Sequence, residues 1–253
     1  GMEAAWVAAH RGHRVTLCER TGVLGGQLLL ASVPPGREEF REVLRYLEVQ
    51  LERKQVRVLL NTEVTPAMVG ELKPDALVIA TGARQIRPHI EGVDGSRVVY
   101  AWDVLAGRAD TGACVVVVGG GATGLETAAL LAERGKRVMV VEMGDRLGRD
   151  IGISTRWVII QDAARLGVEF MKNCRVTAVS GAGVTALRGG EVLNMEADTV
   201  VIAVGTCAED SFEKELEAAG IPAGLEVYRI GDCAAPRKAF EAIREGFDTG
   251  LEL

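Results

Sequence analysis

Short apolar runs alternate along the chain with segments whose apolar residues have helical spacing. Cys114–Val118 is a β-branched run typical of a buried parallel strand, and Leu125–Arg134 has the spacing of a helix that ends at Gly135. Lys136–Val141 is the next predicted strand. Strand, helix and strand in this order are typical of an α/β fold with a parallel sheet.

This pattern occurs twice, because residues 11–15 match residues 134–138 at an offset of 123. Glu19 falls on Glu142 at the same offset. A repeat of this length is too long for a solenoid unit and implies two folded halves. We therefore expect two α/β domains of the dinucleotide-binding, Rossmann-like type, the first of which lacks its first strand.

The second half contains the motif G-x-G-x-x-G between a predicted strand and a predicted helix. Gly119 is expected to make the tight turn, Gly121 to let a pyrophosphate approach the backbone, and Gly124 to allow close helix packing. The N terminus of the following helix offers free N–H groups to that anion, and Ala122 and Thr123 are the loop residues beside it. The alternative interpretation is a turn with a structural role alone.

Acidic side chains follow the motif at two places. Glu142 closes the next strand, 18 residues after Gly124, where it would accept hydrogen bonds from an adenosine ribose and favour NAD over NADP by charge. Arg146 and Arg149 weaken this preference, since they lie close downstream. Glu126, in the first helical turn, either faces the nicotinamide or only complements the helix dipole.

The first half is incomplete under the repeat. Its strand Arg14–Glu19 keeps the terminal acid, but the strand and the two glycines that should precede Gly1 are missing. In a doubly wound sheet that strand is central and buried on both faces. We expect a partner chain, as in a homo-oligomer, a swapped segment or residues outside this sequence to cover the gap, or else a loosely packed half.

Composition narrows the classes of function. The 253 residues carry 29 Lys and Arg against 35 Asp and Glu, a formal net charge of −6, which disfavours nucleic acid as a partner. No apolar run approaches the roughly 20 residues of a membrane helix, and no secretory signal is visible, so we expect no membrane partner and a cytoplasmic location. The five cysteines lack C-x-x-C spacing, which predicts free thiols and no metal site. Cys18 and Cys114 lie inside predicted strands and are expected to be buried.

Three further motifs carry a family resemblance, namely Leu24-Gly25-Gly26-Gln27, Ala80-Thr81-Gly82 and Ile230-Gly231-Asp232. With the two dinucleotide units, they resemble flavoproteins of the glutathione reductase and thioredoxin reductase group, within the pyridine nucleotide-disulfide oxidoreductase-like superfamily. More narrowly, residues 25–36 are similar to the C-terminal portion of the dienoyl-CoA reductase, enoate reductase and trimethylamine dehydrogenase family, the old yellow enzyme-like NADH:flavin oxidoreductases. The resemblance implies FAD and NAD or NADP as cofactors. It also implies a barrel with FMN and an iron-sulfur cluster as a partner domain or subunit.

The resemblance further implies a division of the chain and roles for its residues. Residues 1–108 and 211–253 would form the FAD domain, and residues 109–210 the NAD(P) domain. Glu19 would hold the FAD ribose, unless it is a solvated strand end, and Asp232 would bind the ribityl or phosphate region, unless it is a helix cap. The implied cofactor-binding residues of the first domain are Glu19, Arg20, Gly25, Gly26, Gln27, Val64, Thr81, Gly82, Gly231 and Asp232. Those of the second domain are Gly119, Gly121, Ala122, Thr123, Gly124, Glu142 and Gly205.

The expected function is that of an NAD(P)H-dependent flavin oxidoreductase module. It would pass hydride from nicotinamide to FAD, and electrons to an acceptor outside this chain. No catalytic side chain is required, because hydride transfer needs only two planar rings held in contact. The lack of a C-x-x-C dithiol argues against disulfide reduction. The alternatives are a scaffold that binds an adenine nucleotide and a fragment that binds NAD(P) but not FAD.

Overall fold

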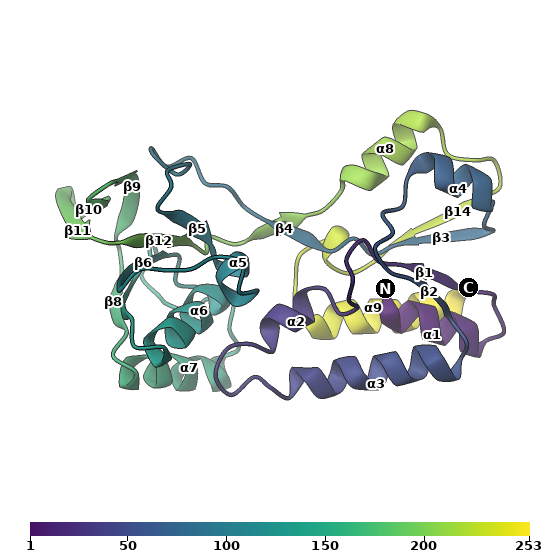
Figure 1. The fold of residues 1–253 in the computed structure, drawn as a ribbon, viewed down its shortest axis with the longest axis horizontal. Coiled ribbons are helices and arrows are strands. Elements are labelled where there is room, and N and C mark those ends of the chain that lie inside the picture. The colour runs from purple at the N-terminus through teal and green to yellow at the C-terminus, as the bar shows by residue number, and fades with distance from the viewer. The chain divides into compact units, whose positions relative to one another are not determined.

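The computed structural model describes residues 1–253, which divide into two compact units. The first unit comprises Gly1–Ser32, Glu39–Arg84 and Thr206–Leu253, and the second comprises Val33–Glu38 and Gln85–Gly205. Each unit combines helices with parallel strands (Figure 1), so the expected α/β class is confirmed. None of the helices has the length and apolar content needed to span a membrane.

The second unit is built on a five-stranded parallel sheet of order β5-β12-β6-β7-β8, with an antiparallel sheet of order β11-β10-β9 beside it. The strands are β5 (Val98–Tyr100), β6 (Cys114–Val118), β7 (Arg137–Val141), β8 (Glu169–Met171), β9 (Arg175–Ser180), β10 (Gly183–Arg188), β11 (Glu191–Glu196) and β12 (Thr199–Ile202). The helices are α5 (Ala101–Leu105), α6 (Ala122–Glu133) and α7 (Ile153–Arg165).

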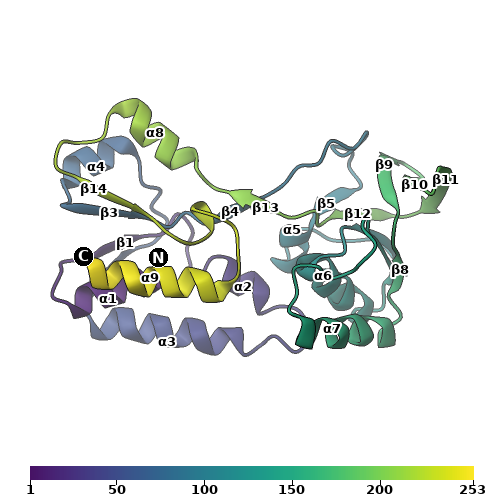
Figure 2. The ribbon, with the colours of Figure 1, turned by 180° about the vertical axis from the view of Figure 1, so that it is seen from behind.

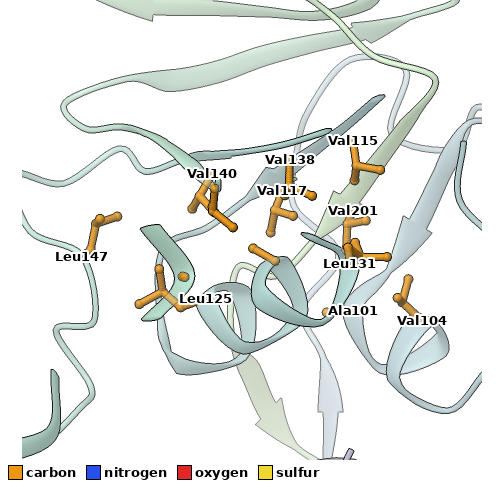
Figure 3. Packing of buried hydrophobic residues seen from close by; sticks show 13 residues of the cluster. Ala101, Val104, Val115, Val117, Leu125, Leu131, Val138, Val140, Leu147 and Val201 are labelled. Atoms are coloured by element: carbon orange, nitrogen blue, oxygen red, sulfur yellow. The ribbon is translucent and has the colours of Figure 1, made fainter. Parts of the chain in front are cut away.

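Both faces of the five-stranded sheet are buried. Val115 and Val117 of β6 pack with Leu125 of α6 in one apolar cluster, which Figure 3 shows from close by. Val116 and Val118 belong to a second cluster, formed with residues of β9 and β10. Successive side chains of a strand point to opposite faces, so a continuous apolar run is what a strand covered on both sides requires.

The first unit contains short strands and longer helices. Its strands are β1 (Thr16–Cys18), β2 (Arg57–Leu59), β3 (Ala76–Ile79), β13 (Thr206–Ala208) and β14 (Glu226–Arg229), and β4 (Ala83–Gln85) pairs with β13. Its helices are α1 (Met2–His10), α2 (Gln27–Ala31), α3 (Phe40–Arg53), α4 (Pro66–Leu72), α8 (Ser211–Ala219), the 3-10 turn η1 (Gly231–Cys233) and α9 (Ala239–Glu252).

Helices α1, α3 and α9 of the first unit lie side by side (Figures 1 and 2). Two glycines permit the close approach of α9 to α1. A Cβ atom on Gly250 would lie 2.7 Å from the Val7 Cβ, and one on Gly246 would lie 3.0 Å from the Glu3 Cβ. Larger residues at either position would push the two helices apart.

The sheet of the first unit is split where the repeat predicts a missing strand. In the second unit β6 lies between β12 and β7. The corresponding strands of the first unit, β3 and β1, each have only one partner, because β3 pairs with β14 and β1 pairs with β2. Within residues 1–253, no strand therefore lies between β3 and β1, where β6 lies in the second unit.

Two expectations were wrong in detail. Residues 85–108 belong to the second unit rather than the first, because β5 forms an edge of the five-stranded sheet, with Val98 paired to Val200. The buried thiols are those of Cys174 and Cys233, whereas Cys18 and Cys114 are half exposed. Cys18 ends the edge strand β1 and Cys114 begins β6, and strand ends are less covered than strand centres.

Candidate dinucleotide-binding sites

The glycine loop of the second unit joins β6 to α6, and two of its glycines cannot carry a side chain. Gly119 has a φ of +110°, and a Cβ there would lie 2.3 Å from the Ala203 carbonyl oxygen. A Cβ on Gly124 would lie 2.0 Å from the Gly119 carbonyl oxygen, so α6 packs directly on the turn. Gly121 has an extended conformation with a φ of −76°, and a Cβ there would have the Asp150 carboxylate as its nearest neighbour, at 3.3 Å. No side chain of the loop thus stands between the Gly121 backbone and a ligand, and the nearest group on that side is the Asp150 carboxylate.

Helix α6 begins at Ala122, three residues before the predicted start at Leu125. The Ala122 N–H donates to both carboxylate oxygens of Asp150, at 3.1 Å each. The Thr123 carbonyl accepts a hydrogen bond of 2.7 Å from the Thr127 hydroxyl. Sequence reasoning did not identify Asp150, because it lies 28 residues from its partner in an irregular segment with no motif.

Glu142 is tied to the glycine loop by its carboxylate. One oxygen accepts from the Gly120 N–H at 2.7 Å, and the other accepts from the Gly144 N–H at 2.6 Å. Each carboxylate oxygen retains a second lone pair with which it can accept a ribose hydroxyl. Arg149 forms an ion pair with Asp145. The structure therefore brings Glu142 to the loop, as the motif spacing predicts.

Glu126 forms an ion pair with Arg37, with 2.6 Å between the guanidinium nitrogen and the carboxylate oxygen. Burial raises the pKa of Glu126, the nearby Arg37 charge and hydrogen bond oppose this rise, and the Asp150 charge adds to it. The ion pair joins α6 to the segment Val33–Glu38, which belongs to the second unit. Arg37 is a second residue that sequence reasoning did not identify.

Gly205 follows β12 at the end of the second unit. Its φ is +108°, and its carbonyl accepts a hydrogen bond of 3.0 Å from the Ile86 N–H. It lies two residues after Ala203, whose carbonyl limits the space at Gly119. The side chains next to Gly205 form no hydrogen bond with the glycine loop. A role for Gly205 in a site therefore rests on its proximity to Ala203 in the backbone.

The acid of the first unit is held differently. One Glu19 oxygen accepts from the backbone N–H and the hydroxyl of Thr21, both at 2.8 Å. The Glu19 carbonyl accepts from the Thr62 N–H at 2.9 Å, which brings the loop containing half-buried Val64 beside the end of β1. Arg20 is exposed and has no hydrogen bond to these residues. The loop that contains Val64 therefore lies next to Glu19, and no glycine loop lies between them.

A second group of predicted residues meets at η1. The Gln27 side-chain amide donates to Asp232 at 3.1 Å, and a Cβ on Gly82 would lie 3.5 Å from that amide nitrogen. Gly25 and Gly26, with φ values of +118° and +51°, form the turn that leads into α2. The motifs that carry the family resemblance are thus brought together, although they are far apart in sequence.

Helix α9 supports the turn at η1 through Glu245. Its carboxylate accepts from the Gly231 N–H at 2.7 Å and pairs with Arg237. The Asp232 carboxylate accepts from the Arg237 N–H at 3.0 Å, but Arg237 precedes α9 and the N-cap of that helix is Lys238, so Asp232 does not cap α9.

Thr81 contacts a segment on the other side of the turn. Its hydroxyl donates to the Glu209 carbonyl at 2.6 Å, and the Gly82 carbonyl accepts from the Glu209 N–H at 2.9 Å. These bonds fix the backbone of Thr81 and Gly82 beside the strand pair β4 and β13.

The residues of the second unit fit a nicotinamide dinucleotide. The open backbone at Gly121 suits a pyrophosphate, the start of α6 suits its charge, and Glu142 suits a ribose. The first unit presents the Gln27, Gly82 and Asp232 group and Glu19, which suit FAD. No group of His, Cys, Asp or Glu in the structure has the arrangement of a metal site.

Comparisons with known proteins give a consistent family. A profile described as pyridine nucleotide-disulphide oxidoreductase matches residues 1–246. The chain is 36% identical over 285 residues to a metal reductase of Desulforamulus reducens, a match that covers 100% of this chain and 42% of the relative. It is 35% identical over 258 residues to an NADH oxidase of Thermoanaerobacter brockii, which covers 100% of this chain and 39% of the relative.

Solved structures agree with these matches. The structure of a 2-naphthoyl-CoA reductase complex superposes with a TM-score of 0.94 at 36% identity, covering 100% of this chain and 38% of that chain. A thioredoxin reductase of T. acidophilum superposes with a TM-score of 0.74 at 19% identity, covering 100% and 93% respectively, and shows the shared fold alone.

The chain spans about two fifths of the length of the curated relatives it matches, and it corresponds to their C-terminal part. Cinnamate reductase of Clostridium sporogenes, 32% identical over 256 residues, is a further relative, so the resemblance to the enoate reductase group is confirmed. Members of the family are oxidoreductases that bind FAD and NAD(P)H. With the profile matching nearly the whole chain, the chain belongs to the pyridine nucleotide-disulphide oxidoreductase family.

Proposed function

We propose that this chain is the NADH-oxidising part of a larger flavoprotein, with a nicotinamide dinucleotide in the second unit and FAD in the first. The proposal rests on the loop between β6 and α6. The backbone of Gly121 and Ala122 would bind a pyrophosphate, and Glu142, which is bonded to the same loop, would accept a ribose hydroxyl. When bound, the two cofactors supply hydride transfer from nicotinamide to flavin, which needs no protein acid or base.

The chain's own residues bind and orient the nucleotides. In the second unit, Gly120 and Gly144 fix both oxygens of Glu142, so a ribose meets an acceptor that is already positioned. The close contact of Gly124 with Gly119 fixes the start of α6 relative to the turn. Arg37 holds Glu126 on the first turn of α6, beside the same loop.

We also propose that NAD is preferred over NADP. The Glu142 carboxylate is fixed at the ribose position and would repel a 2′-phosphate. Arg149 is paired with Asp145, which reduces its capacity to hold that phosphate. The preference predicts tighter binding of NADH than of NADPH in parallel titrations, and equal affinities would contradict it.

For the first unit, we propose that FAD lies along Gly25, Gly26 and Gln27 and reaches Asp232 at η1. Glu245 and Arg237 keep that turn in place. Glu19 would hold the FAD ribose, with Val64 offering its backbone to the adenine beside it. The contact between Gln27 and Asp232 supports this arrangement, because it joins two motifs that have no other reason to meet.

Electrons would leave through an acceptor that this chain does not contain. The relatives are more than twice as long as this chain, which supports a further domain or subunit carrying FMN and an iron-sulfur cluster. All five cysteines are free thiols, in keeping with a reducing compartment such as the cytoplasm.

The experiment that tests the proposal is a visible absorption spectrum of the protein after incubation with FAD, recorded before and after anaerobic NADH. A protein-bound flavin band that bleaches with NADH is the expected result. The split sheet of the first unit favours a specific second candidate, a module that binds NAD(P) but not FAD. A protein that binds NADH and stays colourless after FAD would establish that candidate and contradict the redox proposal.

A further inference from the structure

An internal carboxylate lies where the nucleotide's pyrophosphate is expected. Both oxygens of Asp150 accept from the Ala122 N–H, at 3.1 Å each, at the start of α6. The same carboxylate lies 3.3 to 3.4 Å from the position of a Cβ on Gly121. Asp150 therefore covers the two residues of the loop whose backbone is open to a ligand.

The segment that carries Asp150 is anchored to the glycine loop on its other side. The Gly148 N–H donates to the Gly120 carbonyl at 2.7 Å, and Leu147 is buried against Gly120. Asp150 itself is exposed. Its side chain can therefore rotate into solvent while the segment behind it stays attached.

The local charge makes simultaneous occupancy unfavourable. The charge of Asp150 already acts on the Glu126 carboxyl in the first turn of α6, and the Glu142 carboxylate is bonded to Gly120 of the same loop. A pyrophosphate placed at Ala122 would add charge of the same sign beside Asp150, and both would need the same N–H donor. Only one of the two anions, the Asp150 carboxylate or the pyrophosphate, can therefore occupy the position at the Ala122 N–H.

We propose that Asp150 is an internal competitor of the dinucleotide pyrophosphate, which caps α6 in the free protein and leaves its N terminus when the nucleotide binds. This inference rests on the proposed nucleotide site and adds a switch to it. When no nucleotide is bound, the Asp150 carboxylate accepts a hydrogen bond from the N terminus of α6. This contact stabilises the free protein and lowers its affinity for the nucleotide. Ligands that carry a pyrophosphate meet this competition, whereas adenosine does not.

The test compares Asp150→Asn with the wild-type protein in titrations with NADH, ADP-ribose and adenosine. Asn keeps the shape and one acceptor oxygen but loses the charge that competes with phosphate. We expect the dissociation constants of NADH and ADP-ribose to fall about three- to tenfold and that of adenosine to stay unchanged. Asp145→Asn is the matched control, because it removes an equal charge from the same segment, where Asp145 is 62% exposed and pairs with Arg149.

The outcomes separate the inference from the proposed site. If the wild-type protein binds NADH and Asp150→Asn binds it no more tightly, or if Asp145→Asn gives the same gain, the inference is wrong and the site stands. If neither protein binds NADH, the proposed site fails and the inference fails with it.

Thermal unfolding gives an independent measurement. Loss of the negative charge at the N terminus of α6 should lower the melting temperature of free Asp150→Asn relative to the wild-type protein. The difference should shrink or vanish in saturating NADH, since phosphate then occupies the start of α6 in both proteins. A difference that persists at saturation would show that Asp150 stays on Ala122 in the complex, which would overturn the proposal.

Discussion

The two units contain the same repeat, but different groups form hydrogen bonds with its acidic residue in each unit. In the second unit Glu142 accepts N–H groups from Gly120 and Gly144, next to a strand paired on both sides. In the first unit the Glu19 carboxylate accepts hydrogen bonds only from Thr21, two residues away. Glu19 follows a strand that has one partner. The comparison teaches how strongly a glycine loop beside a central strand fixes the acid. Both oxygens of Glu142 are bonded to backbone N–H groups at that loop and just beyond β7, whereas Glu19 is held by a local turn alone.

The largest expected effect concerns the turn that only the second unit has. Gly119→Ala should lower the free energy of unfolding by about 3 kcal/mol, because the new Cβ combines a positive φ with overlap at the Ala203 carbonyl. Gly135→Ala is the matched control, since Gly135 has a φ of +77° and no atom within 4 Å of a Cβ. It should cost about 1 kcal/mol. Urea titrations followed by circular dichroism measure both, and equal losses would show that the turn is not sterically constrained.

The second effect is mainly on binding. Gly121→Val should weaken NADH binding by at least about 50-fold, because the side chain would fill the open backbone face of the loop. Its extended φ of −76° accommodates Val, but the new side chain would push the Asp150 carboxylate away from Ala122, so the free energy of unfolding should fall by about 1 kcal/mol. Unchanged NADH affinity in a folded variant would mean that the pyrophosphate lies elsewhere.

The third prediction compares the two acids directly. Glu142→Ala leaves the buried Gly120 N–H without its partner and should cost about 2 kcal/mol of unfolding free energy. Glu19→Ala should cost no more than about 0.5 kcal/mol, because Thr21 is exposed and water replaces the carboxylate. Denaturant titrations of both variants would break the comparison if the two losses were equal.

The smallest expected effect is a pH dependence at Glu126. Burial raises its pKa above the ordinary value of 4.5, so the folded protein holds this proton more tightly than the unfolded chain. Stability from this group is present below pH 4.5 and falls as pH rises from there through the raised pKa. Wild-type stability should therefore decline relative to Glu126→Gln over that window, by less than about 1 kcal/mol.

Glu133→Gln, on the exposed end of α6, provides the reference for that measurement. The stability of both variants is measured relative to the wild-type protein at each pH. A Glu126→Gln profile that matches the Glu133→Gln profile, or that slopes the other way, would show that Arg37 offsets or outweighs burial at Glu126.

Local sequence pattern was sufficient for most of the second unit. The β-branched run Cys114–Val118 is β6 in the structure, and the glycines, whose constraint is local, lie where the motif places them. Helix α6 starts at Ala122, whose N–H is bonded to Asp150, and apolar spacing alone does not reveal this start. The internal offset of 123 correctly indicated the split sheet of the first unit.

Contacts between segments that are far apart in sequence could not be predicted from the sequence. Asp150, Arg37 and Glu245 each act on backbone or side chains more than ten residues away, and a charged residue in a loop has no periodic signal. The boundary at residue 85 depends on the pairing of β5 with β12, which follows from sheet order rather than from any change in composition. Pairing partners of this kind are set by tertiary structure.

Hydrogen–deuterium exchange of the full chain with and without saturating NADH tests the central claim most directly, because it reports on both units in one experiment. The account predicts that NADH slows amide exchange in residues 119–126 and around Glu142, and leaves residues 16–27 unchanged. Protection confined to residues 16–27, or no protection near the glycine loop despite bound NADH, would contradict it.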